Sequence, residues 1–334
     1  MIENLTFSCR FQQLGHGLSV PVNPQGIGVP ALVRQNNTVA SLLGLLPELF
    51  DSQHFLDLFS GNYVPECLTP IAQAYAGHQF GAFNPFLGDG RSILLGEVDT
   101  LSGSWELSLK GAGKTPFSFV SDGRASLDEC LHEYYISERL MGLGIPTTRC
   151  LCVIQGEERV YRSGFKPAAV LTRVMPSHIR FGSFENCYFK NDIVALKVLA
   201  DYVIEQHYKE CLAQKGDDKH DYARFFREVV VRTASLIAQW QSVGFVHGMM
   251  NTDNQSIVGV TLDLSESVFM RQHDDDFVAS KSDRHGRYAF GQQPVVGLWN
   301  CNVLARALSP LIPAEDLRQS LALYEEVYLE HSES

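Results

Sequence analysis

The period of the hydrophobic pattern changes midway along this chain, and that change limits the folds open to it. In the first half, apolar residues either alternate with polar ones, as in Trp105–Lys110, or form short runs, and both patterns predict β-strands. We expect strands over the ranges 91–98, 105–110, 148–155, 158–162 and 168–175. One helix is expected among them, over 126–143, because apolar side chains recur there at helical spacing and Gly142, Gly144 and Pro146 end the run.

The second half has helical periodicity instead. We expect two long helices, over 192–208 and 222–243, and a mostly helical tail over 294–333. A strand-rich part with one helix, followed by a helix-rich part, is the plan of protein kinases, so we expect an α+β, protein-kinase-like bilobal fold. The expected domains are an N-terminal extension packed on the core (1–90), a strand-rich N-lobe (91–180) and a helix-rich C-lobe (181–334).

The composition narrows the partners that the chain can bind. Its 334 residues carry a formal net charge of −11, whereas a nucleic-acid surface needs clustered Lys and Arg, so we expect no nucleic-acid partner. No apolar run approaches the ~18 residues that span a membrane, and the N-terminus lacks signal-peptide features. The eight cysteines are scattered without Cys-x-x-Cys pairs, which is typical of reduced thiols. We therefore expect a cytoplasmic monomer without a membrane partner.

Phosphoryl and nucleotidyl transfer depend on groups that position phosphates and neutralise their charge. Lys110 ends an expected strand on its polar side and is a candidate phosphate contact, although a solvated lysine at a strand end has the same pattern. Glu133 on the next helix is a candidate partner for this lysine, in competition with Glu129 and Glu138. At ~100° per residue, Glu138 points ~140° away from Glu133, while Glu129 stays open on geometry alone.

The segment His247–Asn254 holds a second group of candidates. Asp253 and Asn254 end this loop, and Asp263 follows nine residues later, beyond a β-branched run (256–262) that we expect to be a strand. Such oxygen ligands suit Mg²⁺ or Mn²⁺. A turn rich in Asn and Asp would have the same residues, so both a metal site and an ordinary turn stay open as interpretations.

Two glycine-rich turns and a pair of arginines complete the candidates. The turns, Leu87–Arg91 and Ser121–Arg124, would let backbone amides approach phosphates, but both are also typical of ordinary hairpins. Arg173 and Arg180 flank Pro176, so they cannot share one unbroken helix. They suit a phosphate clamp, with surface arginines as the alternative.

Taken together, these motifs resemble those of the selenoprotein O (YdiU) family. The matching segments are Tyr75–Gly81, Leu87–Arg91, Leu109–Pro116, Asp122–Ala125, Leu143–Arg149, Ser177–Gly182, His247–Asn254, Gly286–Phe290 and Leu298–Asn300. They follow one another in the order that the family has.

The resemblance implies a kinase-like fold that binds ATP in a reversed orientation and moves AMP to Ser, Thr or Tyr hydroxyls of proteins, with loss of pyrophosphate. Residues at the family's nucleotide-contact positions are Gly88, Gly90, Arg91, Lys110, Asp122, Gly123, Arg173, Arg180 and Asp263. By the same resemblance, Glu133 would pair with Lys110 and Asp253 would act as proton acceptor. Asn254 and Asp263 would hold Mg²⁺ or Mn²⁺.

Three departures from the family pattern support an alternative function. Leu264-Ser265 stands where the family usually has Tyr-Gly, and Phe119 stands where it has Arg. The chain also ends at Ser334, short of the usual family length, so we expect a truncated C-lobe. The alternative is a catalytically impaired, ATP-binding pseudokinase that acts as a binding module.

Overall fold

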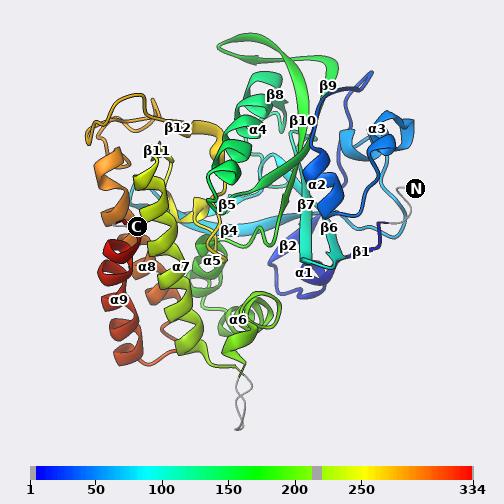
Figure 1. The fold of residues 1–334 in the computed structure, drawn as a ribbon. Helices are drawn as coiled ribbons and strands as arrows, with labels where there is room; N and C mark the ends of the chain where they lie inside the picture. Colours follow the sequence, from blue (N-terminus) through cyan, green and yellow to red (C-terminus); the bar gives the residue numbers. More distant parts are fainter. Residues whose placement is uncertain (1–4, 213–219, 333–334) are drawn as a thin grey trace. The chain divides into compact units, whose positions relative to one another are not determined.

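The computed structural model describes residues 5–212 and 220–332, which divide into two compact units (Figure 1). Described residues of the first unit lie within Met1–Ala74, Phe86–Leu143 and Thr147–His178, and those of the second within Tyr75–Pro85, Gly144–Pro146 and Ile179–Ser334. Most strands belong to the first unit and most long helices to the second. The α+β class is therefore confirmed, with the kinase-like order of a strand-rich part followed by a helix-rich part.

Most of one antiparallel sheet belongs to the first unit. Its strands follow the order β2 (Ser19–Pro21), β4 (Ile71–Gln79), β6 (Ser92–Thr100), β7 (Gly103–Lys110), β10 (Gly164–Met175), β9 (Arg149–Arg162) and β3 (Ala31–Gln35). Three further strands join it: β1 (Phe7–Ser8) beside β6, β5 (Ala82–Gly88) beside β4, and β8 (Ala125–Ser126) beside β10. The parts of β4 and β5 that fall within Tyr75–Pro85 belong to the second unit. The range 1–90, expected to form an extension, thus supplies strands β1 to β5.

Helices lie against this sheet. They are α1 (Arg10–Gln13), α2 (Asn37–Leu42), the 3₁₀ helix η2 (Pro47–Asp51), α3 (Gln53–Ser60) and α4 (Leu127–Gly142). Helix α4 starts where predicted because Ser126 and Glu129 form a capping box, and the acidic residues of its first turn suit the helix dipole. Its buried residues, Cys130, Glu133, Ser137 and Leu140, recur every three or four positions and so form one face.

The two faces of β7 have different surroundings. Leu107 and Leu109 pack in an apolar cluster with residues of α2 and α3. Because successive strand residues point to opposite faces, Lys110 points to the other face, where α4 packs. Arg173 on β10 pairs in register with Ser108, so its side chain also lies on the α4 face.

The second unit is mainly helical. Its helices are α5 (Phe181–Phe189), α6 (Ile193–His207), α7 (Tyr222–Ser242), α8 (Gln293–Leu308) and α9 (Ala314–Ser332), with 3₁₀ turns η3 (Lys209–Cys211), η4 (Thr252–Asn254), η5 (Leu264–Glu266) and η6 (Phe290–Gln292). A small ribbon of β11 (Phe245–Val246) and β12 (Val268–Phe269) pairs antiparallel. Helix α7 packs on α8 and α9, and α5 packs on α8 (Figure 1).

Two details of the predicted elements were wrong. The ranges 148–155 and 158–162 form one continuous strand, β9, because the long β10 pairs with all of it. The range 256–262 is not a strand, although four of its seven residues are β-branched. Gly259 turns the chain there with φ 74°, and the backbone bonds to separate partners, since Ile257 N–H donates to Ile179 O and Thr261 N–H donates to Pro146 O.

Candidate functional site

Three buried charged side chains meet in the first unit. Lys110 Nζ lies 2.5 Å from Glu133 Oε2, and Arg173 Nε lies 2.5 Å from Glu133 Oε1. All three are at most 5% exposed. A buried carboxylate costs several kcal/mol unless it is paired, and here each oxygen of Glu133 contacts a cation. The predicted Lys110–Glu133 pair is confirmed, and two cations share one carboxylate, which holds both in fixed positions.

The competing glutamates of α4 have other partners. Glu129 caps the helix and lies 2.9 Å from Arg91 Nη1. Burial would raise the pKa of Glu129, but the Arg91 charge and the Ser126 amide outweigh it and lower this pKa to about 2. Glu138 accepts two hydrogen bonds from Arg149, at 2.8 and 2.9 Å. Arg91, predicted to contact nucleotide, is thus engaged with Glu129.

Both glycine-rich turns border the segment that follows Lys110. Thr115 Oγ1 donates to Asp89 O at 2.6 Å, and Ser118 Oγ donates to Gly90 O. A side chain at Gly88 would overlap the ring of Phe117, and one at Gly90 would lie 2.9 Å from Phe117 O. Glycine is therefore required at both positions by close packing.

The second turn approaches the same segment. Gly113 N–H donates to Gly123 O at 3.2 Å, and Gly123 has φ 72°, where a side chain would meet the backbone of Gly113. Asp122 instead binds Arg162, with contacts of 2.9 and 3.1 Å. These hydrogen bonds lower the pKa of Asp122. The structure thus brings Gly88, Gly90 and Gly123 to one segment and places Asp122 in a half-exposed ion pair.

A separate group surrounds Asp253 in the second unit. Its carboxyl is buried, Oδ2 accepts a hydrogen bond from Gln79 Nε2 at 3.2 Å, and Oδ1 has no hydrogen-bond partner among the described residues. Burial raises the pKa of Asp253 to about 6, against the opposing charge of Arg180. A carboxyl group with such a pKa is suited to accept a proton near neutral pH.

Arg180 joins the residues predicted to bind metal. Its Nη1 donates to Asp253 O at 2.6 Å and to Asn254 Oδ1 at 3.5 Å, and lies 3.8 Å from Asp263 Oδ2. Asn254 Oδ1 and Asp263 Oδ2 therefore both lie within 4 Å of the same guanidinium nitrogen, Arg180 Nη1. Asp263 adopts the left-handed conformation (φ 62°), which Asp tolerates better than most residues.

The oxygens in this group fit the predicted ion. Asn254 Oδ1 and the Asp263 carboxylate, which both face Arg180 Nη1, are hard donors of the kind that Mg²⁺ and Mn²⁺ prefer. Between residues 5–212 and 220–332, no three His, Cys, Asp or Glu side chains gather into a group able to hold a metal alone. Mg²⁺ commonly takes one or two protein carboxylates, and waters and phosphates complete its shell.

The segment 75–81 supports Asp253, a role that sequence reasoning missed. A side chain at Gly77 would lie 2.8 Å from Asp253 Oδ1, and one at Gly182 would overlap Ala76 O. His78 N–H donates to Thr252 Oγ1 at 2.7 Å, next to Asp253. The motif Tyr75–Gly81 was visible in the sequence but carried no assigned role.

A half-buried histidine, His78, pairs with the buried Glu185 beside this loop. His78 Nδ1 lies 2.5 Å from Glu185 Oε2. Burial raises the pKa of Glu185 to about 7. Burial lowers the pKa of His78, helped by the charges of Arg306 and Arg287. Both groups are thus shifted toward their neutral forms.

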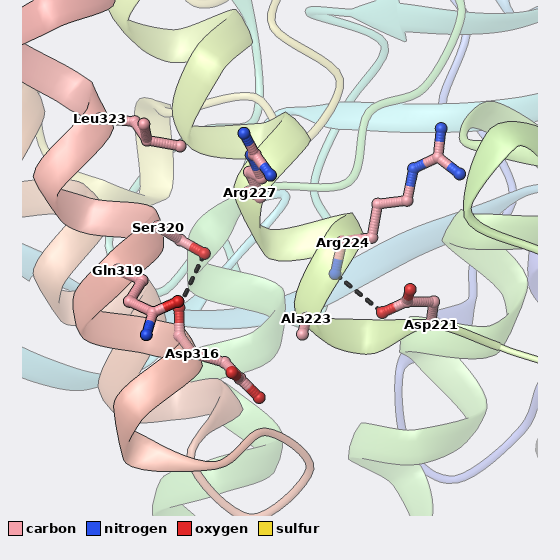
Figure 2. A pocket seen from close by; sticks show the side chains of 8 residues that line it. All are labelled: Asp221, Ala223, Arg224, Arg227, Asp316, Gln319, Ser320 and Leu323. Carbon is pink, nitrogen blue, oxygen red and sulfur yellow. Dashed lines mark hydrogen bonds between the residues drawn. The ribbon is translucent and has the colours of Figure 1, made fainter.

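The chain also has a cavity away from these groups. It measures about 440 Å³ and lies between α7 and α9, lined among others by Asp221, Arg224, Asp316 and Ser320 (Figure 2). Arg224 N–H donates to Asp221 at the start of α7, and Ser320 Oγ donates to Asp316 O within α9. None of the residues predicted from the sequence as functional lines this cavity.

Comparisons with known proteins agree with the motifs. A family model described as "Protein adenylyltransferase SelO" matches residues 1–334. The "Protein nucleotidyltransferase YdiU" of Pseudomonas fluorescens (strain Pf0-1) is 45% identical over 331 residues, which are 99% of this chain and 67% of that protein. The protein of the same name from Aliivibrio salmonicida (strain LFI1238) is 45% identical over 324 residues, 97% of this chain and 66% of that protein. The chain spans about two thirds of the length of these relatives.

Other comparisons add little. The solved structure titled "WaaP in complex with acyl carrier protein" matches 72% of this chain and 85% of that chain, with a TM-score of 0.27 and 11% identity, too weak a likeness to support an argument. Among the residues described, no helix combines the length and the apolar character that a membrane span requires.

Proposed function

Because this chain belongs to the SelO family of protein nucleotidyltransferases, we propose that it transfers AMP from ATP to Ser, Thr or Tyr hydroxyls of proteins and releases pyrophosphate. The observation that carries this proposal is the carboxyl of Asp253. It is buried, one of its oxygens has no hydrogen-bond partner among the described residues, and its pKa is raised to about 6. A base with those properties is what the deprotonation of a hydroxyl at neutral pH requires.

In the proposed reaction, the acceptor hydroxyl oxygen forms a bond to the α-phosphorus of ATP. The bond from that phosphorus to the oxygen that bridges to the β-phosphate breaks, and pyrophosphate leaves with the electron pair. The hydroxyl proton passes to Asp253 Oδ1. Gln79 keeps the other carboxyl oxygen in place through its hydrogen bond.

We assign the phosphates of ATP to the cationic side chains. Lys110 and Arg173 are held by one carboxylate, so they need no reordering when an anion binds. By the family resemblance, the remaining proposed nucleotide contacts are Gly88, Gly90, Gly123 and Arg180. Mg²⁺ or Mn²⁺, when bound, neutralises phosphate charge, and Asn254 and Asp263 are the ligands that we assign to it. Cytoplasmic location, a monomeric state and the lack of nucleic-acid partners stay predictions.

A second candidate function is ATP binding without turnover, as a catalytically impaired pseudokinase. Ser265 Oγ donates to Asp263 Oδ1 at 3.0 Å and so occupies one oxygen of a proposed metal ligand. Phe119, at the position where the family has Arg, is 64% exposed and supplies no charge. Both observations favour weaker metal and phosphate binding than the family pattern would provide.

The test is to incubate the purified chain with ATP labelled in either the α- or the γ-phosphate, with Mg²⁺ or Mn²⁺ present. Protein-bound α label is expected from AMP transfer. Protein-bound γ label would instead indicate a kinase, and ATP binding with neither label would indicate the pseudokinase.

A further inference from the structure

Two arginines of the second unit lie on aromatic rings. Arg287 Cζ lies 4.6 Å from the centre of the Trp299 ring, and Arg306 Cζ lies 5.4 Å from that of Phe189. The ring of His78 connects them, at 5.4 Å from Trp299 and 6.1 Å from Phe189. We name Arg287, Trp299, Phe189 and Arg306 the arginine–aromatic surface.

Neither arginine pairs with a carboxylate in the part of the chain that the structure describes, although the protein carries a net charge of −11. Burial lowers the pKa of His78, and the charges of Arg306 and Arg287 lower it further. Positive charges without carboxylate partners favour an anionic ligand.

The position of Arg287 is built into the fold. A side chain at Gly81 would lie 3.1 Å from Arg287 Cζ, and Gly81 has φ 85°, a conformation that favours glycine. The guanidinium therefore lies between this turn and the Trp299 ring. An arginine fixed in this way loses little side-chain entropy when it binds an anion.

A cavity adjoins Arg287 and is large enough for side chains of a partner. It measures about 600 Å³, and its lining includes Arg287, Trp299, the 64% exposed Val295 and Asp276. Its walls are thus cationic, aromatic and aliphatic, a combination typical of peptide-binding sites. Asp276 is the acidic group among these four.

The arginine–aromatic surface is tied to the loop of Asp253. His78 N–H donates to Thr252 Oγ1, and the next residue, Gln79, donates to Asp253 itself. Phe80 N–H donates to Asn251 Oδ1 at 3.1 Å. Residues 78–80 therefore hold residues 251–253 of the Asp253 loop through three hydrogen bonds. A partner bound at this surface lies near the proposed proton acceptor.

We propose that the arginine–aromatic surface binds an acidic segment of the acceptor protein, a stretch with Asp or Glu close to the hydroxyl that receives AMP. This inference rests on the proposed function, because it names the substrate class of the same site. The two arginines contact the carboxylates, and Trp299, Phe189 and Val295 contact the apolar parts of the segment. ATP is assigned elsewhere, to Lys110, Arg173 and Arg180.

Binding is tested with two fluorescent peptides that differ only around a central Ser, which is flanked by Glu in one and by Gln in the other. We expect fluorescence anisotropy to show that the whole chain binds the Glu peptide more tightly. Arg287→Gln and Arg306→Gln should each weaken this binding about two- to fivefold, and the double variant about tenfold, as is usual for exposed charge pairs. Asp276→Asn should strengthen it, and added salt should weaken it.

Arg318→Gln is the matched control, because Arg318 is an exposed arginine on α9 whose partner is Glu315. It should leave binding of the Glu peptide unchanged. Equal affinity for the two peptides, no binding of either, or equal weakening by Arg318→Gln would overturn the proposal, as would displacement of the Glu peptide by ATP.

The binding assay needs no turnover, so it separates this inference from the proposed function. If the Glu peptide binds through Arg287 and yet no α label is transferred, the binding site stands and the transferase activity is refuted. If AMP is transferred equally well to both peptides, with the same KM, the activity stands and the acidic-segment site is refuted.

Discussion

Burial raises the pKa of the Asp253 carboxyl to about 6, and the hydrogen bond from Gln79 opposes that shift. A base works only when deprotonated, so we expect kcat/KM for AMP transfer to rise with pH through about 6 and then level off. Gln79→Met removes a bond that stabilises the charged form. The midpoint of the pH profile should therefore move up, and transfer should fall more at neutral than at alkaline pH.

The matched control for that profile is Gln53→Met, since Gln53 is exposed on α3 and bonds only to Asp57 within its helix. It should keep the midpoint of the starting protein. A profile of Gln79→Met that is lowered equally at every pH would show that Gln79 does not act on the Asp253 titration.

Glu133 neutralises two buried cations, Lys110 and Arg173. Glu133→Gln leaves Lys110 and Arg173 charged and unneutralised by this side chain, so we expect the free energy of unfolding to fall by ~3–5 kcal/mol. In Glu138→Gln the broken pair with Arg149 is partly exposed, and the loss should be ~1 kcal/mol or less. Urea unfolding of both variants measures the difference, and equal losses would contradict the buried pairing.

At the scale of elements, two helical glycines make a contrasting pair. A side chain at Gly297 of α8 would overlap Ile237 of α7 and Tyr324 of α9, whereas one at Gly142, the last residue of α4, would meet nothing within 4 Å. Gly142→Ala should raise stability by ~0.5–1 kcal/mol, because alanine is the better helix former. Gly297→Ala should lower it by ~1–3 kcal/mol through overpacking.

Thermal unfolding of the two variants, monitored by circular dichroism, checks this contrast. Helix propensity alone would raise the melting temperature in both. A rise in Gly297→Ala would therefore show that α8 moves away from α7 and α9 at little cost.

At the scale of the whole molecule, the two charged groups lie in different units and should contribute different parts of one activity. Lys110→Ala should weaken ATP binding as well as AMP transfer, because it removes a phosphate contact. Asp253→Asn should lower transfer ~10²–10⁴-fold and change ATP affinity only a few-fold, since it removes a base. Calorimetric ATP titration and α-label transfer measure the two effects.

Asp51→Asn, an exposed acidic position in η2, serves as the control and should change neither quantity. Loss of ATP binding in Asp253→Asn would assign this carboxyl to ligand binding and would contradict its role as proton acceptor.

Periodicity explains what sequence reasoning predicted correctly. The alternation in β7 placed Lys110 on a polar face, and the 3.6-residue period of α4 separated Glu133 from Glu138. Periodicity left Glu129 open as the partner of Lys110, and the family resemblance selected Glu133. The positions of α4, α6 and α7 did follow from local periodicity. Helix starts were also local, since Ser126 and Glu129 form their capping box within one turn.

The sequence by itself thus determined the order of elements, the α+β class, the family and the Lys110–Glu133 pair. Only the tertiary structure decided that 256–262 is not a strand, because a strand needs a continuous partner and this segment has separate ones. The tertiary structure alone showed that Gln79 donates a hydrogen bond to Asp253, although the two residues are 174 positions apart in the chain. It alone also showed that burial raises the pKa of the Asp253 carboxyl. Contacts between distant residues and the loss of water around a charge leave no periodic signal in a sequence, because both depend on what the rest of the chain packs against the residue.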